Sequence, residues 1–295
     1  MIKKILSFSL TLVLLFICSG CSTFNEIPEI PEAEPIITET IPPDIDEILP
    51  SEEPTIETEP PFKEFTFFDE STTFEYSLVE SEDLMRYIQF VPTNADQYEK
   101  LPLLVWLHGT GEKNASAEKF FDTSFVEALC NWELEGVNAY ILCPQLYGDY
   151  HSKFWSTEEA TQNVKNLIDD FSANHNVDTS KIVIMGHSLG GQGCQYMAYS
   201  LPDYFSAQVV MSGYPAYVDM NEVTIPTIAY IGTSDLGETE GAMDYTYGYF
   251  KSVYGEESIV KIPASHGYLP KASLIRDKNE NNRSDLMEWI YDNIY

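Results

Sequence analysis

The chain has 295 residues, 44% of them hydrophobic, which is enough to bury the core of one α/β domain of about 230 residues. Its formal net charge is −31, and such an acidic surface repels nucleic acid and anionic membrane surfaces, which we exclude as ligands. The cysteines beyond the N-terminal segment, Cys130, Cys143 and Cys194, are odd in number and widely spaced, so we expect buried thiols, with a Cys130–Cys143 disulfide as the alternative.

Residues 1–21 have the pattern of an export signal: Lys3 and Lys4 precede an apolar run that ends in Cys18-Ser-Gly-Cys21. The run is too short for a spanning helix of about 20 residues. Small residues before Cys21 resemble a bacterial lipobox, although Cys18 stands where that motif usually has Leu. We expect Cys21 to be lipidated and the protein to be extracytoplasmic, in contact with the membrane only through this anchor. A plain cleaved signal is the alternative.

Residues 22–61 contain 12 acidic residues, no Lys or Arg, and many prolines. Like charges and prolines keep a segment extended and unpacked, so we expect a disordered tether. The catalytic domain is then 62–295.

The domain is expected to begin with an antiparallel edge, because 62–68, 74–79 and 85–91 alternate apolar and polar residues. The continuous apolar run 101–107 is typical of a strand covered on both faces. His108-Gly-Thr110-Gly-Glu follows it. We expect the Thr110 N–H to be one donor of an oxyanion hole and His108 to be structural.

Helices over 120–134 and 157–174, with a strand over 138–143 between them, indicate a doubly wound, mostly parallel sheet. The aromatic segment after that strand, 144–155, stands where ligand crevices open in such sheets. We expect its Gln145, Tyr147 and Trp155 to contact substrate, with loop packing as the alternative.

The stretch 181–191 carries the nucleophile motif: a β-branched strand, then Gly186-His-Ser188-Leu-Gly190, then a helix over 192–200. A sharp strand-to-helix turn exposes the serine hydroxyl, and the flanking glycines remove Cβ atoms that would collide where strand and helix meet. The N–H of Leu189, at the helix N-terminus, is the second expected oxyanion donor.

Two further strands, 207–211 and 225–231, are separated by about a dozen residues, too few for a large lid. The second strand leads to Asp235, expected to orient the base, with Glu238, Glu240 and Asp244 as alternatives. The strand 258–262 then leads to His266, the expected general base.

Oxygen-bearing residues recur between 277 and 288 ahead of a helix over 286–294, and resemble a calcium loop of EF-hand or dockerin type. The ligands would be Asp277, Asn279, Asn281, Asp285 and Glu288. A polar surface loop, with Asp285 capping the helix, is the alternative, since Asn282 replaces the usual Gly.

The order Ser188, Asp235, His266 is that of α/β-hydrolases. From about residue 82, the chain is similar to compact esterases of that superfamily, including feruloyl and acetylxylan esterases, polyhydroxybutyrate depolymerases and phospholipase/carboxylesterase relatives. The resemblance implies the α/β-hydrolase fold and a monomeric serine hydrolase that needs no cofactor and acts on small or polymer-linked esters. A serine peptidase of the same fold and a non-catalytic surface lipoprotein remain alternatives.

Overall fold

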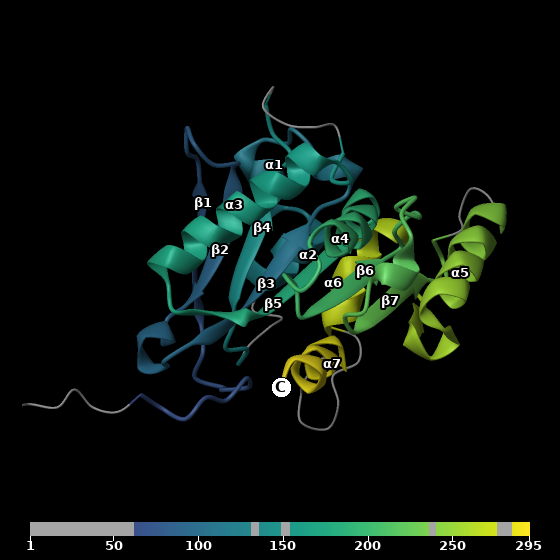
Figure 1. Ribbon diagram of the computed structural model, residues 1–295. Helices are drawn as coiled ribbons and strands as arrows, with labels where there is room; N and C mark the ends of the chain where they lie inside the picture. The colour runs from purple at the N-terminus through teal and green to yellow at the C-terminus, as the bar shows by residue number, and fades with distance from the viewer. Residues whose placement is uncertain (1–61, 131–135, 149–153, 236–239, 276–284) are drawn as a thin grey trace, which may run out of the picture. The chain divides into compact units, whose positions relative to one another are not determined.

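A sheet of eight strands is the centre of the computed structural model (Figure 1). The described residues are 62–130, 136–148, 154–235, 240–275 and 285–295. The strands are β1 (Phe74–Val79), β2 (Tyr87–Pro92), β3 (Leu101–Leu107), β4 (Tyr140–Pro144), β5 (Val177–His187), β6 (Ala207–Met211), β7 (Thr227–Gly232) and β8 (Ile259–Ile262).

The strand order is β1-β2-β4-β3-β5-β6-β7-β8. β2 is antiparallel to both β1 and β4, and every pair from β4 to β8 is parallel. The predicted fold class, a mostly parallel sheet with an antiparallel N-terminal edge, is confirmed. The carboxyl ends of β3, β5, β7 and β8 therefore lie at one edge of the sheet, where the residues that follow them can meet.

Helices cover both faces of this sheet. They are α1 (Ala117–Phe121), α2 (Ser124–Cys130), α3 (Glu158–Asn174), α4 (Leu189–Ser200), α5 (Glu240–Tyr254), α6 (Leu269–Ile275) and α7 (Asp285–Ile294). The helix predicted over 157–174 is confirmed as α3, capped by Thr157, whose hydroxyl accepts the N–H of Ala160. No helix in these described ranges is long and apolar enough to cross a membrane.

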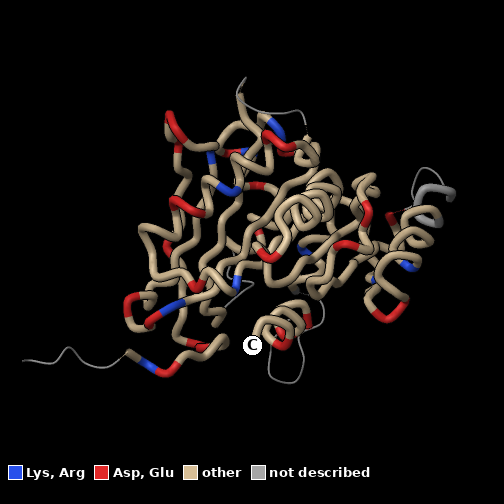
Figure 2. The backbone as a smooth tube through the Cα atoms, in the orientation of Figure 1, with Lys and Arg blue, Asp and Glu red and all other residues tan. Residues whose placement is uncertain are grey.

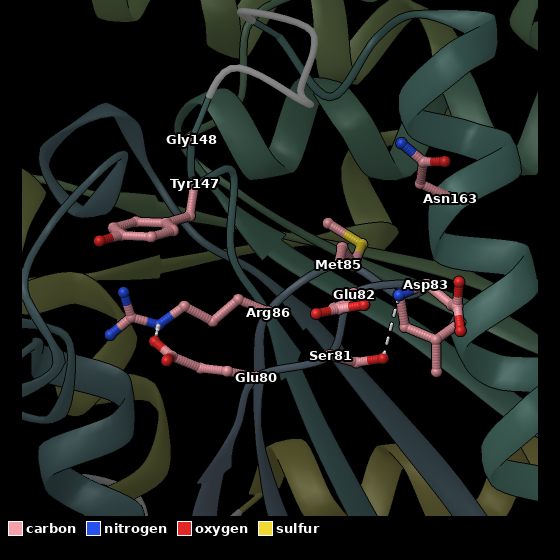
Figure 3. Close-up of a pocket in the computed structure, with 10 residues that line it drawn as sticks. Glu80, Ser81, Glu82, Asp83, Met85, Arg86, Tyr147, Gly148 and Asn163 are labelled. Atoms are coloured by element: carbon pink, nitrogen blue, oxygen red, sulfur yellow. Dashed lines mark hydrogen bonds and ion pairs between the residues drawn. The ribbon is translucent and has the colours of Figure 1, made fainter.

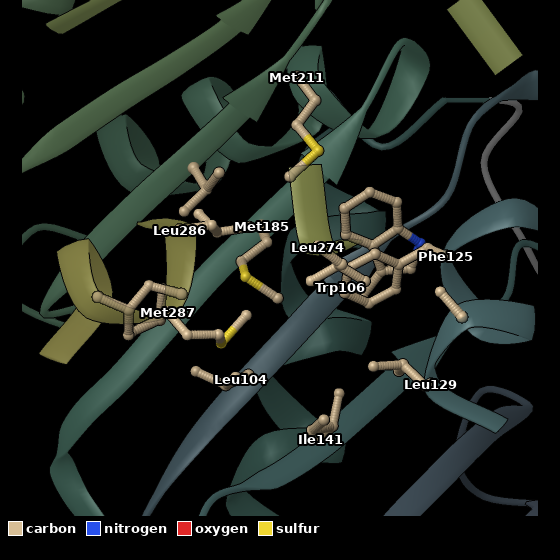
Figure 4. Close-up of a cluster of buried hydrophobic side chains, with 14 of the residues drawn as sticks. Leu104, Trp106, Phe125, Leu129, Ile141, Met185, Met211, Leu274, Leu286 and Met287 are labelled. Carbon is tan, nitrogen blue, oxygen red and sulfur yellow. The ribbon is translucent and has the colours of Figure 1, made fainter. Parts of the chain in front are cut away.

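The alternation of side chains along β3 divides the core into two layers. Leu103 and Val105 belong to the cluster that α3 and α4 cover, whereas Leu104 and Trp106 belong to the cluster under α2, α6 and α7. Figure 4 shows the second cluster, in which the rings of Trp106 and Phe125 stack at 3.7 Å between centroids. All seven residues of β3 are buried, as its continuous apolar sequence predicts for a doubly covered strand.

Residues 62–68 do not form the predicted strand, and only Phe68 makes an isolated bridge, to Val137. The aromatic side chains here pack on the C-terminal helix and the residue after it instead. The ring of Phe65 stacks on that of Tyr295 with centroids 4.9 Å apart, and the ring centroids of Phe67 and Tyr291 are 5.7 Å apart. The alternation reflects this packing and not a sheet ladder.

The helix predicted over 120–134 is interrupted. α1 ends at Phe121, and α2 begins at Ser124. Between them the Thr123 hydroxyl donates to the Phe120 carbonyl, a local bond that competes with continuation of the helix. Residues 131–135 lie outside the described residues.

The connection between β6 and β7, residues 212–226, contains a single 3₁₀ turn, Met220–Glu222. It is therefore too small to form a lid over the carboxyl edge of the sheet, as the sequence predicts.

Figure 2 shows Asp and Glu distributed over the helices and loops of the domain, with few Lys and Arg between them.

Candidate active site

Ser188 occupies the turn between β5 and α4 with φ 55° and ψ −114°. A positive φ is costly for a residue with a side chain, so the surroundings must hold it in place. The Ser188 N–H donates to the carbonyl of Met211 at the end of β6, at 2.9 Å. The strand-turn-helix expected around the nucleophile motif is confirmed, and the neighbouring strand fixes its backbone.

The two motif glycines are required by close contact. A Cβ on Gly190 would stand 1.8 Å from the Leu107 carbonyl oxygen, and one on Gly186 would stand 2.5 Å from the backbone of Gly190. Both neighbours are backbone atoms, which cannot rotate away. The prediction that glycines allow α4 to close on the strands is confirmed.

Asp235 and His266 follow the neighbouring strands β7 and β8 and are directly paired. His266 Nδ1 lies 2.7 Å from Asp235 Oδ1, with the Asp235 side chain mostly buried and that of His266 43% exposed. Burial alone would raise the pKa of the Asp235 carboxyl, but the hydrogen bond and charge of His266 hold that pKa below its usual value. An ionised Asp235 keeps the proton on Nδ1, which leaves Nε2 as the basic nitrogen.

His187, the residue before Ser188, packs its ring against His266 with centroids 4.3 Å apart. Burial, followed by the nearby His266, lowers the pKa of His187 to about 3. His187 is therefore neutral at physiological pH and provides a fixed surface for the His266 ring. The sequence motif places a histidine here but does not indicate this contact.

The segment after β3 lies against Ser188. The point where a Cβ on Gly109 would stand is 3.5 Å from Ser188 Cβ. Thr110 begins the 3₁₀ turn Thr110–Glu112 directly after Gly109, and Leu189 is the first residue of α4, whose N–H has no acceptor within the helix. Leu189 therefore follows Ser188 directly in the chain, and Thr110 follows the glycine that lies against Ser188, while the role of both as oxyanion donors remains a prediction.

His108 is fully buried, and its two ring nitrogens have different partners. Nδ1 lies 2.6 Å from the Gly109 carbonyl, and Nε2 accepts the N–H of Leu146 at 3.0 Å. Because Nε2 accepts, Nδ1 carries the proton and donates it to Gly109. Burial lowers the pKa of His108 to about 4, so this neutral form persists. The expected structural role of His108 is confirmed.

Trp155 and Gln145 lie beneath this segment and do not line a cleft. Both are fully buried. Trp155 Nε1 donates to the His108 carbonyl, and Gln145 Nε2 donates to the carbonyls of Glu112 and Ala115. The prediction that these two side chains contact substrate is corrected in favour of packing, because both are fully buried and Trp155 Nε1 and Gln145 Nε2 donate to the loop after β3.

Replacing Trp155 with alanine should destabilise the protein by about 3–5 kcal/mol, because it empties a fully buried aromatic site. Chemical unfolding followed by circular dichroism measures this. The adjacent Phe154, which is 52% exposed, provides the control: Phe154→Ala should change stability by about 0.5 kcal/mol or less. Normal stability combined with altered ester selectivity in Trp155→Ala would restore the substrate-contact interpretation.

Tyr147 is 40% exposed and borders a cavity of about 640 Å³. Its ring lies over the guanidinium of Arg86, 4.2 Å from the centroid, and Figure 3 shows Asn163 of α3 on the far side of the cavity. The next residue, Gly148, donates its N–H to Asn114 Oδ1, so the cavity wall is tied to the loop that carries Thr110. Of the three predicted substrate contacts, Tyr147 is the one that the structure leaves accessible.

Several predicted residues lie outside the described residues. These include the signal, the tether and Cys21, as well as Asp277, Asn279 and Asn281 of the candidate calcium loop; Asp285 and Glu288 lie in the first turn of α7. In the part of the chain that is described, no three His, Cys, Asp or Glu side chains form a metal cluster. Cys130, Cys143 and Cys194 are free thiols, which excludes the alternative disulfide.

The sequence matches a protein-family model described as "Putative esterase" over residues 82–243. This range contains Ser188, Thr110 and Asp235. A curated relative, an uncharacterized secreted protein of Arthroderma benhamiae, is 31% identical over 129 residues, which is 41% of this chain and 13% of that protein. The match thus spans only about an eighth of the relative's length.

Three solved structures illustrate the fold. A thermostable esterase matches with a TM-score of 0.51 at 19% identity, over 74% of this chain and 62% of its own. The feruloyl esterase module from Clostridium thermocellum, in complex with sinapinate, gives 0.52 at 14% identity, over 74% and 94%. An S-formylglutathione hydrolase from Agrobacterium tumefaciens gives 0.52 at 15% identity, over 79% and 98%. At these identities the likeness concerns the fold.

Proposed function

The chain belongs to the putative esterase family, and from this premise we propose that it is a serine hydrolase that cleaves carboxylic esters through an acyl-enzyme. The observation that carries the proposal is the 2.7 Å hydrogen bond between His266 and Asp235, formed at the same sheet edge as a serine held at positive φ. A serine on a strained turn with an oriented histidine nearby is the arrangement that nucleophilic acyl transfer requires.

In the proposed mechanism, Ser188 Oγ attacks the ester carbonyl while His266 Nε2 takes its proton. The negative charge that develops on the carbonyl oxygen is stabilised by the N–H groups of Thr110 and Leu189. The alcohol leaves with the proton that His266 returns, and an acyl group remains on Ser188. His266 then activates a water molecule that hydrolyses the acyl-enzyme. Apart from that water molecule and the substrate, these steps use side chains and backbone groups of this chain.

A labelling and substrate panel tests this function. The purified protein is treated with a fluorophosphonate and assayed on p-nitrophenyl acetate, methyl ferulate, S-formylglutathione and a peptide p-nitroanilide. The feruloyl ester and the thioester enter the panel because two structures of similar fold are named for them. Labelling with ester turnover supports the proposal, faster anilide cleavage would favour a peptidase, and a folded protein that is not labelled would favour a binding lipoprotein.

We further propose that the protein is a monomer held outside the cytoplasm by a lipid on Cys21, with residues 22–61 as tether and a small or polymer-linked ester as substrate. Cys21→Ala should move the protein from the membrane fraction to the medium, because a lipid chain supplies most of the membrane affinity. Cys18→Ala is the matched control and should remain with the membrane. Retention of the Cys21 variant at the membrane would exclude this anchor.

A further inference from the structure

Three side chains come close to one point, the position that a Cβ atom would occupy on Gly109. The position of a Cβ at Gly109 lies 3.3 Å from Glu112 Oε2, 3.4 Å from His187 Nδ1 and 3.5 Å from Ser188 Cβ. The Glu112 carboxylate therefore turns back over the segment after β3. Its Oε2 atom and the Cβ atom of Ser188 both lie within 3.5 Å of the same point. No step of the proposed mechanism uses it.

The backbone of Glu112 is held firmly, so this placement follows from the fold. Its carbonyl accepts both the side-chain amide of Gln145, at 2.8 Å, and the N–H of Ala115, at 3.1 Å. Glu112 is also the last residue of the 3₁₀ turn that begins at Thr110. The turn therefore fixes where the Glu112 side chain begins, and the direction that this side chain adopts places Oε2 near Gly109 and Ser188.

The carboxylate is half-buried, and its charge is not neutralised by a direct partner. Burial raises the pKa of Glu112, while its own N–H, Lys119 and His266 act in the opposite direction. Among the described residues, none of the ion pairs includes Glu112. When ionised, Glu112 is a negative charge without a direct ion-pair partner among the described residues, and it lies beside Ser188.

We propose that Glu112 is a specificity-determining residue that favours esters of cationic alcohols and disfavours esters of anionic alcohols. This inference rests on the proposed ester hydrolysis. The alcohol side is chosen because His266, whose charge acts on Glu112, must return its proton to the leaving alcohol. At close range a like charge is repelled and an opposite charge is attracted, so one carboxylate discriminates both ways.

Three acetates that differ mainly in charge test the inference: acetylcholine is cationic, 3,3-dimethylbutyl acetate is its uncharged isostere, and the acetate of 3-hydroxypropanoate is anionic. Hydrolysis is followed by pH-stat at about pH 8 and low salt, well above the usual carboxyl range. The full chain is compared with Glu112→Gln, which removes the charge and keeps the shape. Glu118→Gln, at an exposed acidic position in the first turn of α1, is the matched control.

The expected result is that the ratio of kcat/KM for the cationic over the anionic ester falls about tenfold or more in Glu112→Gln, tenfold being about 1.4 kcal/mol. Turnover of the neutral ester should change by about twofold or less, and Glu118→Gln should match the wild type. Added salt should lower the ratio of kcat/KM for the cationic over the anionic ester in the wild type. The same ratio in Glu112→Gln should change little.

Two outcomes would overturn the inference alone. An unchanged ratio in Glu112→Gln would mean that the carboxylate does not act on the alcohol. Equal loss of all three activities would mean that Glu112 only maintains the turn that carries Thr110. A folded wild type that hydrolyses none of the three esters and is not labelled by fluorophosphonate would instead overturn the proposed function, and the inference with it.

Discussion

Replacing Ser188 with alanine should lower kcat for ester hydrolysis by about 10⁶-fold and abolish fluorophosphonate labelling, because loss of the nucleophile removes the acyl-enzyme route altogether. Some rate above that of the uncatalysed reaction should remain, since oxyanion donors and substrate binding act without the serine. Steady-state kinetics with p-nitrophenyl acetate and labelling in a gel measure both effects. The fold should be retained, because the change removes one hydroxyl group.

Ser200→Ala is the matched control, because Ser200 is an exposed serine at the other end of α4. It should keep wild-type labelling and turnover. Labelling that persists in Ser188→Ala at the wild-type rate would place the reactive nucleophile elsewhere and remove the basis of the mechanism.

Replacing Gly190 with alanine should destabilise the protein by about 3 kcal/mol or more, at or above the upper end of the usual cost of overpacking. The added methyl group would stand 1.8 Å from the carbonyl oxygen of Leu107 and 2.4 Å from its carbon. Neither group can rotate aside, so α4 must move away from β3. In a domain of this size the melting temperature should fall by roughly 6–12 °C, and labelling of Ser188 should weaken as the turn shifts.

Gly248→Ala provides the comparison, because this helical glycine in α5 has nothing within 4 Å of its Cβ position. There, alanine should stabilise the protein by about 0.5–1 kcal/mol, since it favours the helix and meets no neighbour. Thermal unfolding of both variants measures the contrast. Equal melting temperatures would show that β3 and α4 can separate without cost.

The parts of the fold that were predictable have a strong local signal. The apolar run of β3 and the 3.6-residue period of α3 each determine one structure with little help from distant residues. The turn around Ser188 was predictable because its glycine motif is a local sequence pattern, although one of the contacts that requires it, between Gly190 and Leu107, joins distant residues. The chain order of Ser188, Asp235 and His266 then indicated which strand ends must meet.

The failures involve side chains whose neighbours are distant in sequence. Alternation over 62–68 suggested a strand, yet its phenyl rings pack on a helix more than 200 residues later. Trp155 follows a strand end as a substrate contact would, but its burial depends on His108 and on the small face of Gly193. The approach of Glu112 to Ser188 depends on a turn held by Gln145, and periodicity carries no information about it.

The hydrogen bond from Ser188 to the end of β6 has a consequence for the biosynthesis of the protein. A chain made from its N-terminus exposes β5 and the nucleophile turn before the acceptor carbonyl of Met211 exists, and His266 comes later still. Parallel strands pair only after long connections have closed, so these contacts form late in folding. The turn that carries Ser188 and the pair of Asp235 and His266 therefore acquire their final geometry only when nearly all of the domain has been synthesised.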